Sequence, residues 1–241
     1  VVYQARDPSL DRVVALKVLH PAFASRADVT QRFLSEARRA ASLEHKGIVH
    51  IYEAGEHQAR PYIAMQYLPG GTLAQRLQSE PLPFDAALTL LDQVAAALDY
   101  AHRRQLVHRD IKPANILFDG EGNAVLVDFG LVKSLLESGC TVEGATLGTP
   151  HYMAPEQAQP GEVGAWTDVY ALGSVTFEML TGRVPFQADT PLAVLRAQVD
   201  APPPDPCALN PSLEPAVAAV VLKALAKRPA ERFQSAGEFA R

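Results

Sequence analysis

The sequence predicts an α+β fold in two lobes, a small one built on an antiparallel sheet with one helix and a larger one that is mainly helical. Short apolar runs bounded by turn residues fill residues 1–68, which is typical of strands. Apolar residues recur every three to four positions through much of residues 69–241, which is typical of helices. Pro69-Gly70-Gly71 falls where one pattern replaces the other, so we place the boundary between the lobes after Leu68.

The composition is that of an ordinary globular protein. The 241 residues are 48% hydrophobic and 20% charged, which suits one large domain or two packed lobes. The net charge of -5 argues against nucleic-acid binding, which normally needs a basic face. Cys140 and Cys207 lie outside any metal-ligand spacing, which favours a reducing, cytoplasmic setting. The longest apolar segments are too short to span a bilayer, so we expect no membrane contact by this chain.

In the first lobe, four segments have the residue pattern of strands: residues 1–6, 12–19, 47–54 and 60–68. On the second segment Ala15 and Lys17 face the same side of the strand. A small residue beside a lysine leaves room for a flat ring and supplies a charge for its phosphates. Residues 27–43 have apolar side chains at helical spacing, with Glu36 on a flank that could turn toward the sheet.

The second lobe begins with a capping signal and continues with long helices. Thr72-Leu73-Ala74-Gln75 fits a capping box and predicts a short helix. Further helices are predicted around residues 88–101, 167–180 and 214–227. We interpret His102, at the end of the first of these, as a packing or surface residue.

Residues 106–130 contain the densest set of chemically useful side chains. Asp110 is followed two residues on by Lys112 and five residues on by Asn115, and Asp128 comes after a turn-rich interval. Short apolar runs around them place these groups at strand ends and in a loop, where a scaffold can hold them rigidly. A proton acceptor, a cation and two oxygen ligands for a hard metal suit the transfer of a phosphate bound to magnesium.

At these residues the sequence resembles the protein kinases. His108-Arg109-Asp110 with Asn115 resembles the H-R-D-x-x-x-x-N element, and Asp128-Phe129-Gly130 resembles D-F-G. Val14-Ala15-Leu16-Lys17 resembles V-A-I-K, and Ala154-Pro155-Glu156 resembles A-P-E. Several such elements in the right order make a strong signal. The resemblance implies a bilobal kinase fold over the whole chain, with residues 1–68 as the N-lobe and hinge.

The resemblance also implies the catalytic roles. Asp110 would accept or orient the proton of the substrate hydroxyl, and Lys112 would neutralise charge on the transferring group. Asn115 and Asp128 would hold the Mg²⁺ ions, or Mn²⁺, that bridge the phosphates of ATP.

Further residues are expected to bind ATP. Lys17, aligned by Glu36, would hold the α and β phosphates. The other expected contacts, which surround the adenine, are Val2, Ala15, Met65 as gatekeeper, Gln66, Leu68 and Leu117. Gln66 stands where many relatives carry Glu, but its expected contact is through the backbone.

Residues 131–156 resemble the activation segment of kinases, and a connection this long is commonly functional. Arg109 could pair with a phosphate on this segment, so phosphorylation at Thr141 or Thr146 is a plausible ordering switch. Ser134 and Ser138 remain alternatives.

Three residues are expected to have structural roles. Asp168 resembles the helix F aspartate that braces the catalytic loop backbone, although a carboxylate that caps its own helix is a compatible alternative. Arg232 resembles the arginine that forms a buried ion pair with the A-P-E glutamate, here Glu156.

The resemblance narrows the substrate. Lys112 in R-D-I-K-P-A-N and Thr149 in G-T-P favour serine or threonine acceptors over tyrosine, so protein substrates with such hydroxyls are the expected partners. The residues of both elements are most similar to those of the bacterial branch of these kinases. Members of that branch often carry a membrane segment and a sensor domain, so we expect a cytoplasmic kinase domain, whose parent protein could be membrane-anchored. A kinase dimer that phosphorylates itself in trans is compatible with this assignment.

Two other functions share part of this residue pattern. A pseudokinase scaffold would be expected to lack Lys17, Asp110 or Asp128, and all three are present. A small-molecule phosphotransferase, such as an aminoglycoside kinase, would be expected to have the same catalytic set of Asp, Asn and Asp, here Asp110, Asn115 and Asp128. It would not be expected to combine the A-P-E element with Asp168 and Arg232.

The ends of the chain suggest a fragment. Val1-Val2 matches the last positions of the kinase Gly-rich loop, and Arg241 falls inside a final expected helix. We therefore expect a longer parent protein, with the first strand and the phosphate-covering loop outside this chain.

We predict that the parent protein is an active kinase and that the isolated 241-residue chain binds Mg-ATP weakly or not at all. The reason is that backbone amides of the Gly-rich loop would be missing from the phosphate site. Titration calorimetry on the isolated chain tests this expectation, and micromolar binding of Mg-ATP would contradict it.

Overall fold

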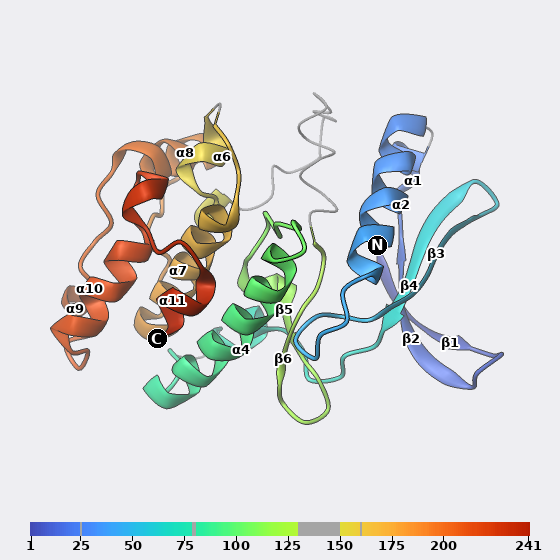
Figure 1. Cartoon of the computed structure of the whole chain (residues 1–241), viewed down its shortest axis with the longest axis horizontal. Helices are drawn as coiled ribbons and strands as arrows, with labels where there is room; N and C mark the ends of the chain where they lie inside the picture. The colour runs from blue at the N-terminus through green and yellow to red at the C-terminus, as the bar shows by residue number, and fades with distance from the viewer. Residues whose placement is uncertain (25, 79–80, 130–149, 160) are drawn as a thin grey trace.

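The computed structural model describes residues 1–24, 26–78, 81–129, 150–159 and 161–241, and these form a strand-rich lobe and a helical lobe (Figure 1). The first lobe holds four strands: β1 (Val2–Asp7), β2 (Arg12–Val18), β3 (Ile51–His57) and β4 (Arg60–Gln66). They form one antiparallel sheet in the order β1-β2-β4-β3. The predicted fold class is therefore confirmed, with a small antiparallel sheet and a mainly helical second lobe.

Helix α2 (Ala27–Ala41) follows the short α1 (Pro21–Ala24) and packs on strands β3 and β4. Figure 1 shows α2 on the side of the sheet that faces the helical lobe. Its apolar stripe, with Val29, Phe33 and Ala37, is buried. The spacing of that stripe is what predicted the helix, and burial of such a stripe is the main source of helix stability in proteins.

The predicted strand over residues 47–54 is shifted in the structure, because its first residues pair with the other lobe. Val49 N donates to Leu126 O at 2.9 Å, and Leu126 N donates to Gly47 O at 2.8 Å. Ile48 forms an isolated parallel bridge with Leu126. The sheet strand β3 therefore begins at Ile51 and extends to His57, three residues beyond the predicted end.

The second lobe contains a β-hairpin, helices and 3-10 turns among its described residues. Its strands are β5 (Ile116–Phe118) and β6 (Ala124–Leu126). Its helices are α3 (Leu73–Arg76), α4 (Phe84–His102), α6 (Pro155–Ala158), α7 (Ala165–Thr181), α8 (Pro191–Asp200), α9 (Pro206–Leu209), α10 (Pro215–Ala224) and α11 (Ala236–Ala240). The 3-10 turns are η1 (Pro113–Asn115), η2 (Pro150–Tyr152) and η3 (Pro229–Glu231). The capping box predicted at Thr72 is present, since its side chain accepts from Gln75 N.

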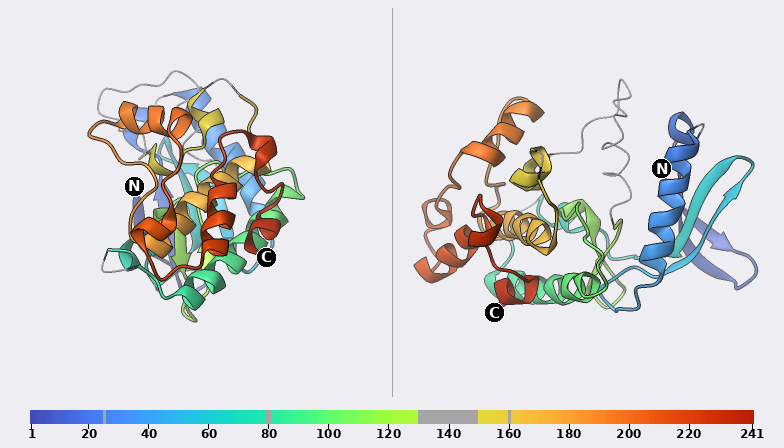
Figure 2. Two further views of the ribbon diagram at one scale, coloured as in Figure 1. Left: turned by 90° about the vertical axis from the view of Figure 1, so that its left-hand side faces the viewer. Right: turned by 45° about the horizontal axis from the view of Figure 1, so that its top comes forward.

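Helix α7 is the centre of the helical lobe. Most of its residues are buried, and α4, α10 and α11 pack against it (Figure 2). A helix that is apolar nearly all round is expected in the middle of a core. Polar residues buried on α7, such as Asp168, therefore need partners from neighbouring segments.

The Pro-Gly-Gly break has a steric reason. Gly70 N donates to Phe118 O at 2.9 Å, and Phe118 N donates to Gly71 O at 3.0 Å, so the break runs along the β5–β6 hairpin. A Cβ on Gly70 would lie 2.7 Å from Phe118 Cβ, which is too close for any residue but glycine. The break therefore holds the hairpin beside the segment that joins the two lobes.

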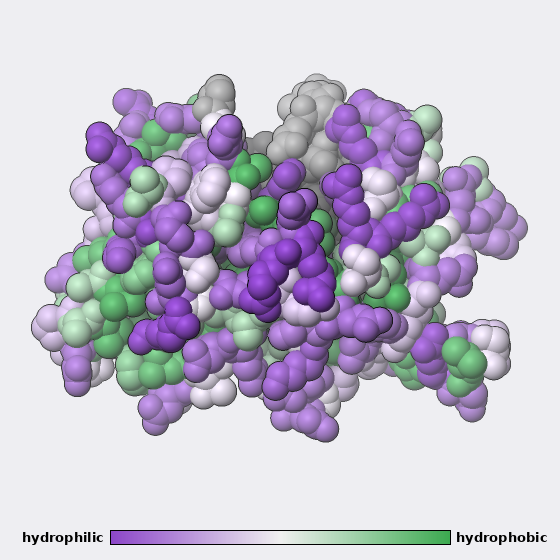
Figure 3. Space-filling model, viewed as in Figure 1, coloured by the Kyte–Doolittle hydropathy of each residue, from purple (hydrophilic) through white to green (hydrophobic). Residues whose placement is uncertain are grey.

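Apolar surface gathers over α9, α10 and the start of α4 (Figure 3). A groove of about 220 Å³ lies there, lined among others by Leu88, Val217 and Val220. Leu88 is near the start of α4, whereas the catalytic-type residues follow the end of this helix. The groove is therefore separate from them.

Within the described residues, the structure contains no helix with both the length and the apolar character of a membrane span.

Asp99 on α4 should stabilise the fold by holding the start of α11. Its carboxylate accepts from Ala236 N at 3.0 Å and from Gly237 N at 3.1 Å. We expect Asp99→Ala to lower the free energy of unfolding by about 1–3 kcal/mol, because two amides at a helix N-terminus lose a charged acceptor. Urea unfolding measures this change. Asp92→Ala, at an exposed position on the same helix, is the control, with an expected change within about 0.5 kcal/mol; equal losses in the two variants would contradict the prediction.

Candidate active site

Asp110, Lys112 and Asn115 form one hydrogen-bonded cluster between α4 and β5. Lys112 Nζ lies 2.7 Å from Asp110 Oδ2, and Asn115 Nδ2 lies 2.9 Å from the same oxygen. Asn115 Nδ2 also donates to the backbone oxygen of Asp110 at 2.8 Å. The 3-10 turn η1 brings Asn115 back to Asp110, so local chain geometry builds the cluster that the spacing suggested.

Lys17 and Asp128 join the two lobes. Lys17 Nζ on β2 lies 2.7 Å from Asp128 Oδ1, just beyond β6. Asp128 has a left-handed backbone with φ of 63°, which is uncommon outside glycine and common at functional sites. Glu36 lies half-buried on α2. Its expected pairing with Lys17 stays a prediction.

His108 is fully buried between Asp110 and the segment around Asp128. Burial lowers its pKa, although the nearby aspartates oppose the shift, so the neutral imidazole is favoured. Its Nε2 lies 2.9 Å from Val127 O, and its Nδ1 accepts from Asp110 N at 3.3 Å. The ring also packs on Phe129, with ring centroids 4.5 Å apart. His108 thus connects the backbone of Asp110 to the residues around Asp128.

Asp168 on α7 holds the loop that contains Asp110. Its carboxylate is fully buried, and accepts from His108 N and Arg109 N at 2.8 Å each. His102 Nε2 lies 2.7 Å from Asp168 Oδ2. Burial alone would raise the pKa of Asp168, but its hydrogen bonds and the nearby histidines lower it overall, so the carboxylate stays ionised. Sequence reasoning missed this contact of His102, because no local pattern shows that the end of α4 meets the start of α7.

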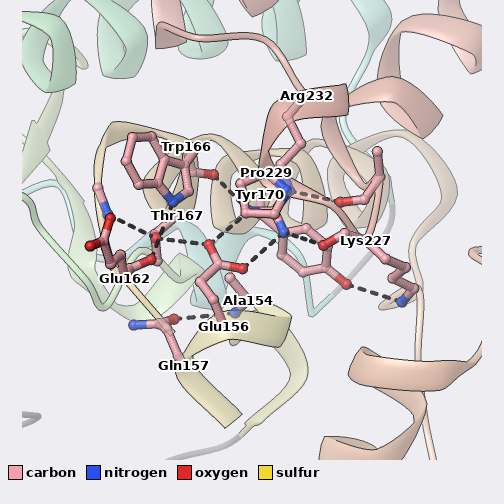
Figure 4. A network of polar contacts seen from close by, with 12 residues as sticks. Ala154, Glu156, Gln157, Glu162, Trp166, Thr167, Tyr170, Lys227, Pro229 and Arg232 are labelled. Atoms are coloured by element: carbon pink, nitrogen blue, oxygen red, sulfur yellow. Dashed lines mark hydrogen bonds and ion pairs between the residues drawn. The ribbon is translucent and has the colours of Figure 1, made fainter. Parts of the chain in front are cut away.

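Glu156 on α6 and Arg232 after η3 are brought together as a buried ion pair (Figure 4). Arg232 Nη1 and Nη2 lie 2.8 Å and 2.9 Å from the two carboxylate oxygens of Glu156. The remaining donors of Arg232 bind the backbone oxygens of Trp166, Ala226 and Lys227. All five N–H donors of the guanidinium are therefore used, which is what makes a buried charge tolerable.

A second buried network holds the turn η2. Gln198 on α8 is fully buried, and its Nε2 donates to Pro150 O at 3.1 Å and His151 O at 2.6 Å. Its Oε1 accepts from the hydroxyl of Tyr170 at 2.6 Å. Lys227 Nζ donates to Gln198 O at 2.7 Å. Burial lowers the pKa of Lys227 to about 8, helped by Arg232 and opposed by Asp200.

The residues expected to surround adenine lie on the strands and on the segment between the lobes. Ala15 on β2 pairs with Met65 on β4, and Met65 and Leu68 are buried. Gln66 ends β4, Leu117 lies on β5, and Val2 on β1 is exposed. Their contacts with ATP stay predictions.

The expected regulatory threonines, Thr141, Thr146 and Thr149, lie outside the described residues, as do Ser134, Ser138 and Gly130. Arg109, which was expected to pair with a phosphate on that segment, is described. Its backbone is left-handed, with φ of 65°.

Asn115 and Asp128 fit a hard divalent cation. Because Nδ2 of Asn115 donates to Asp110, Oδ1 of Asn115 is the atom that remains for a metal. Among the described residues, no cluster of three or more His, Cys, Asp or Glu side chains could hold a metal ion.

The family model and the relatives that match this chain are all protein kinases. The family model described as protein kinase domain matches residues 1–238. Serine/threonine-protein kinase PrkC of Bacillus subtilis is 41% identical over 236 residues, which cover 98% of this chain and 36% of that protein. Serine/threonine-protein kinase PknB of Mycobacterium tuberculosis is 40% identical over 244 residues, covering 98% of this chain and 39% of that protein. The chain thus spans little more than a third of these curated relatives.

A solved structure is also similar. The kinase domain of PknI from Mycobacterium tuberculosis superposes with a TM-score of 0.79 at 32% identity, covering 99% of this chain and 88% of that chain. At this level of identity and overlap, the two chains share one fold.

Lys227 should make the stability of the chain depend on pH. Its pKa falls from 10.5 to about 8 on folding, so between these values the unfolded chain binds more protons than the folded one. The free energy of unfolding contributed by Lys227 therefore rises with pH across this window. We expect the stability of the wild type relative to Lys227→Met to increase between about pH 7 and about pH 10 in urea unfolding.

Lys46→Met, at an exposed lysine, is the control, and its difference from the wild type should stay nearly constant. A constant difference for Lys227→Met would contradict the prediction.

Proposed function

Because the chain belongs to the protein kinase domain family, we propose that the protein carrying it transfers the γ-phosphate of ATP to serine and threonine hydroxyls of proteins. The observation that supports this best is the joint arrangement of a three-residue cluster and an ion pair. Asp110 is hydrogen-bonded to Lys112 and Asn115, and Lys17 is paired with Asp128 across the lobes. These are the groups that phosphate transfer from a metal–nucleotide complex needs.

Asp110 is proposed to act on the substrate hydroxyl. Lys112 and Asn115 both contact its Oδ2, so Oδ1 is the oxygen that a hydroxyl could approach. The carboxylate would orient the hydroxyl and take its proton, while the Lys112 ammonium would neutralise charge on the transferring phosphate.

The family uses ATP and a divalent metal, and we propose Mg²⁺, or Mn²⁺, for this chain. Asn115 and Asp128 would hold the ion, which would neutralise charge on the phosphates. Lys17 would contact the α and β phosphates, and Glu36 would orient it. Val2, Ala15, Met65, Leu68, Leu117 and the backbone of Gln66 would enclose the adenine.

Control by phosphorylation is proposed for Thr141 or Thr146. Arg109 carries the positive charge expected to meet such a phosphate, next to Asp110 in sequence. Thr149, which comes just before Pro150 in the sequence, would help to favour serine and threonine acceptors. We place the boundary between the two lobes after Leu68. The proposed substrates are proteins, and the proposed location of this domain is the cytoplasm. A dimer of two kinase domains is proposed for phosphorylation in trans.

Asp110→Asn should abolish most of the phosphate transfer by the parent protein. The amide cannot accept the hydroxyl proton, so we expect the rate to fall by about a hundredfold or more. Transfer of radiolabelled phosphate to a protein rich in serine and threonine measures the rate. Asp189→Asn, at an exposed aspartate, controls for the general effect of the substitution and should leave the rate unchanged. Near-normal transfer by Asp110→Asn would rule out the proposed role.

A further inference from the structure

Gln157 connects helix α6 with the loop that contains Asp110. Its Nε2 donates to the backbone oxygen of Arg109 at 3.0 Å, across 48 positions of the sequence. Its Oε1 accepts from Ala154 N at 3.2 Å, a contact that caps the start of α6 (Figure 4). One side-chain amide thus binds two backbone groups on different segments.

The oxygen that Gln157 binds belongs to the peptide unit that joins Arg109 to Asp110. Arg109 has a left-handed backbone, which costs a non-glycine residue free energy and persists when its surroundings hold it. Asp168 holds the N–H on one side of Arg109, and Gln157 holds the C=O on the other. The two peptide planes that flank Arg109 are therefore fixed by two different side chains.

The support under Gln157 is rigid. The preceding residue, Glu156, is paired with the buried Arg232, and Thr167 Oγ1 donates to Glu156 Oε1 at 2.8 Å. Pro155 is buried at the start of the same helix. A group can position a reacting side chain only where its own place is fixed, and α6 meets that condition.

We propose that Gln157 is a positioning residue for phosphate transfer, which orients Asp110 by holding the carbonyl of Arg109. The proposal rests on the proposed function of Asp110. Gln157 touches neither nucleotide nor substrate; it acts through the peptide plane that precedes Asp110. Loss of its donor would let Arg109 relax from the left-handed conformation and would misplace the Asp110 carboxylate, and small displacements of a reacting group lower rates strongly.

The simpler explanation is that Gln157 only caps α6. Glutamate and glutamine serve this capping role equally, because both offer a side-chain oxygen to the backbone N–H. Glutamate at this position would keep the acceptor for Ala154 N, but it has no N–H to donate to Arg109 O. It would also place a carboxylate against a carbonyl oxygen. Gln157→Glu therefore separates the two explanations.

The kinetic test compares Gln157→Glu with Gln159→Glu in the full-length parent protein. Gln159 is exposed two residues further on, so the control makes the same chemical change on the same segment. We expect Gln157→Glu to lower kcat about tenfold, the effect of one lost hydrogen bond, with KM for ATP and Tm close to wild type. Gln159→Glu should match the wild type in all three. Wild-type kcat in Gln157→Glu overturns the proposal, and so does a loss of kcat that a large fall in Tm accompanies.

A second measurement keeps the test independent of activity. Hydrogen exchange of the backbone amides of residues 108–111 should be about tenfold faster in Gln157→Glu than in Gln159→Glu, since the loop loses one anchor. If the wild type transfers no phosphate, the proposed function fails. The exchange comparison then still decides whether Gln157 holds the loop, and equal exchange in the two variants overturns the proposal.

Discussion

The buried carboxylate of Asp168 is the interaction on which the site depends. A charge without solvent contact is costly unless its oxygens are fully hydrogen-bonded. Asp168 meets this requirement with two consecutive backbone N–H groups, from His108 and Arg109, and with His102. The same bonds that make the charge tolerable fix the loop just before Asp110. The same hydrogen bonds therefore stabilise the buried charge on helix α7 and set the geometry of the site.

The ion pair of Glu156 and Arg232 applies the same principle near the start of α7, at Trp166 and Thr167. Arg232 binds backbone oxygens of Trp166 and Lys227 as well as Glu156, so it ties α6, α7 and the segment after α10 together. Helix α6 then carries Gln157 to the carbonyl of Arg109. Two buried charges, contributed by segments far apart in the sequence, thus converge on the peptide units that precede Asp110.

The sequence predicted the parts of this arrangement that follow from local pattern or from resemblance. The cluster of Asp110 with Asn115 follows from their spacing, and the fold class follows from the change of apolar period near residue 68. The missed features depend on contacts between distant segments. The bonds of Gly47 and Val49 to Leu126 displaced a predicted strand, and no local signal shows them.

The charged side chains that hold the structure together differ from those proposed to act in phosphate transfer in how many of their polar atoms are hydrogen-bonded within the chain. The side chains of Asp168 and Arg232 are 0% exposed, and their polar atoms are committed to partners within the chain. Lys17 and Asp128 are 13% and 23% exposed, and Lys112 and Asp110 are 26% and 22% exposed. These four groups keep donors or oxygens that a nucleotide, a metal or a hydroxyl could engage.

A side chain that must exchange partners during phosphate transfer cannot have all its donors and acceptors bound within the protein. A side chain that fixes the backbone, in contrast, must have them all bound. The neighbouring positions Arg109 and Asp110 show both conditions side by side: the backbone of Arg109 is held by Asp168 and Gln157, and the carboxylate of Asp110 stays within reach of solvent.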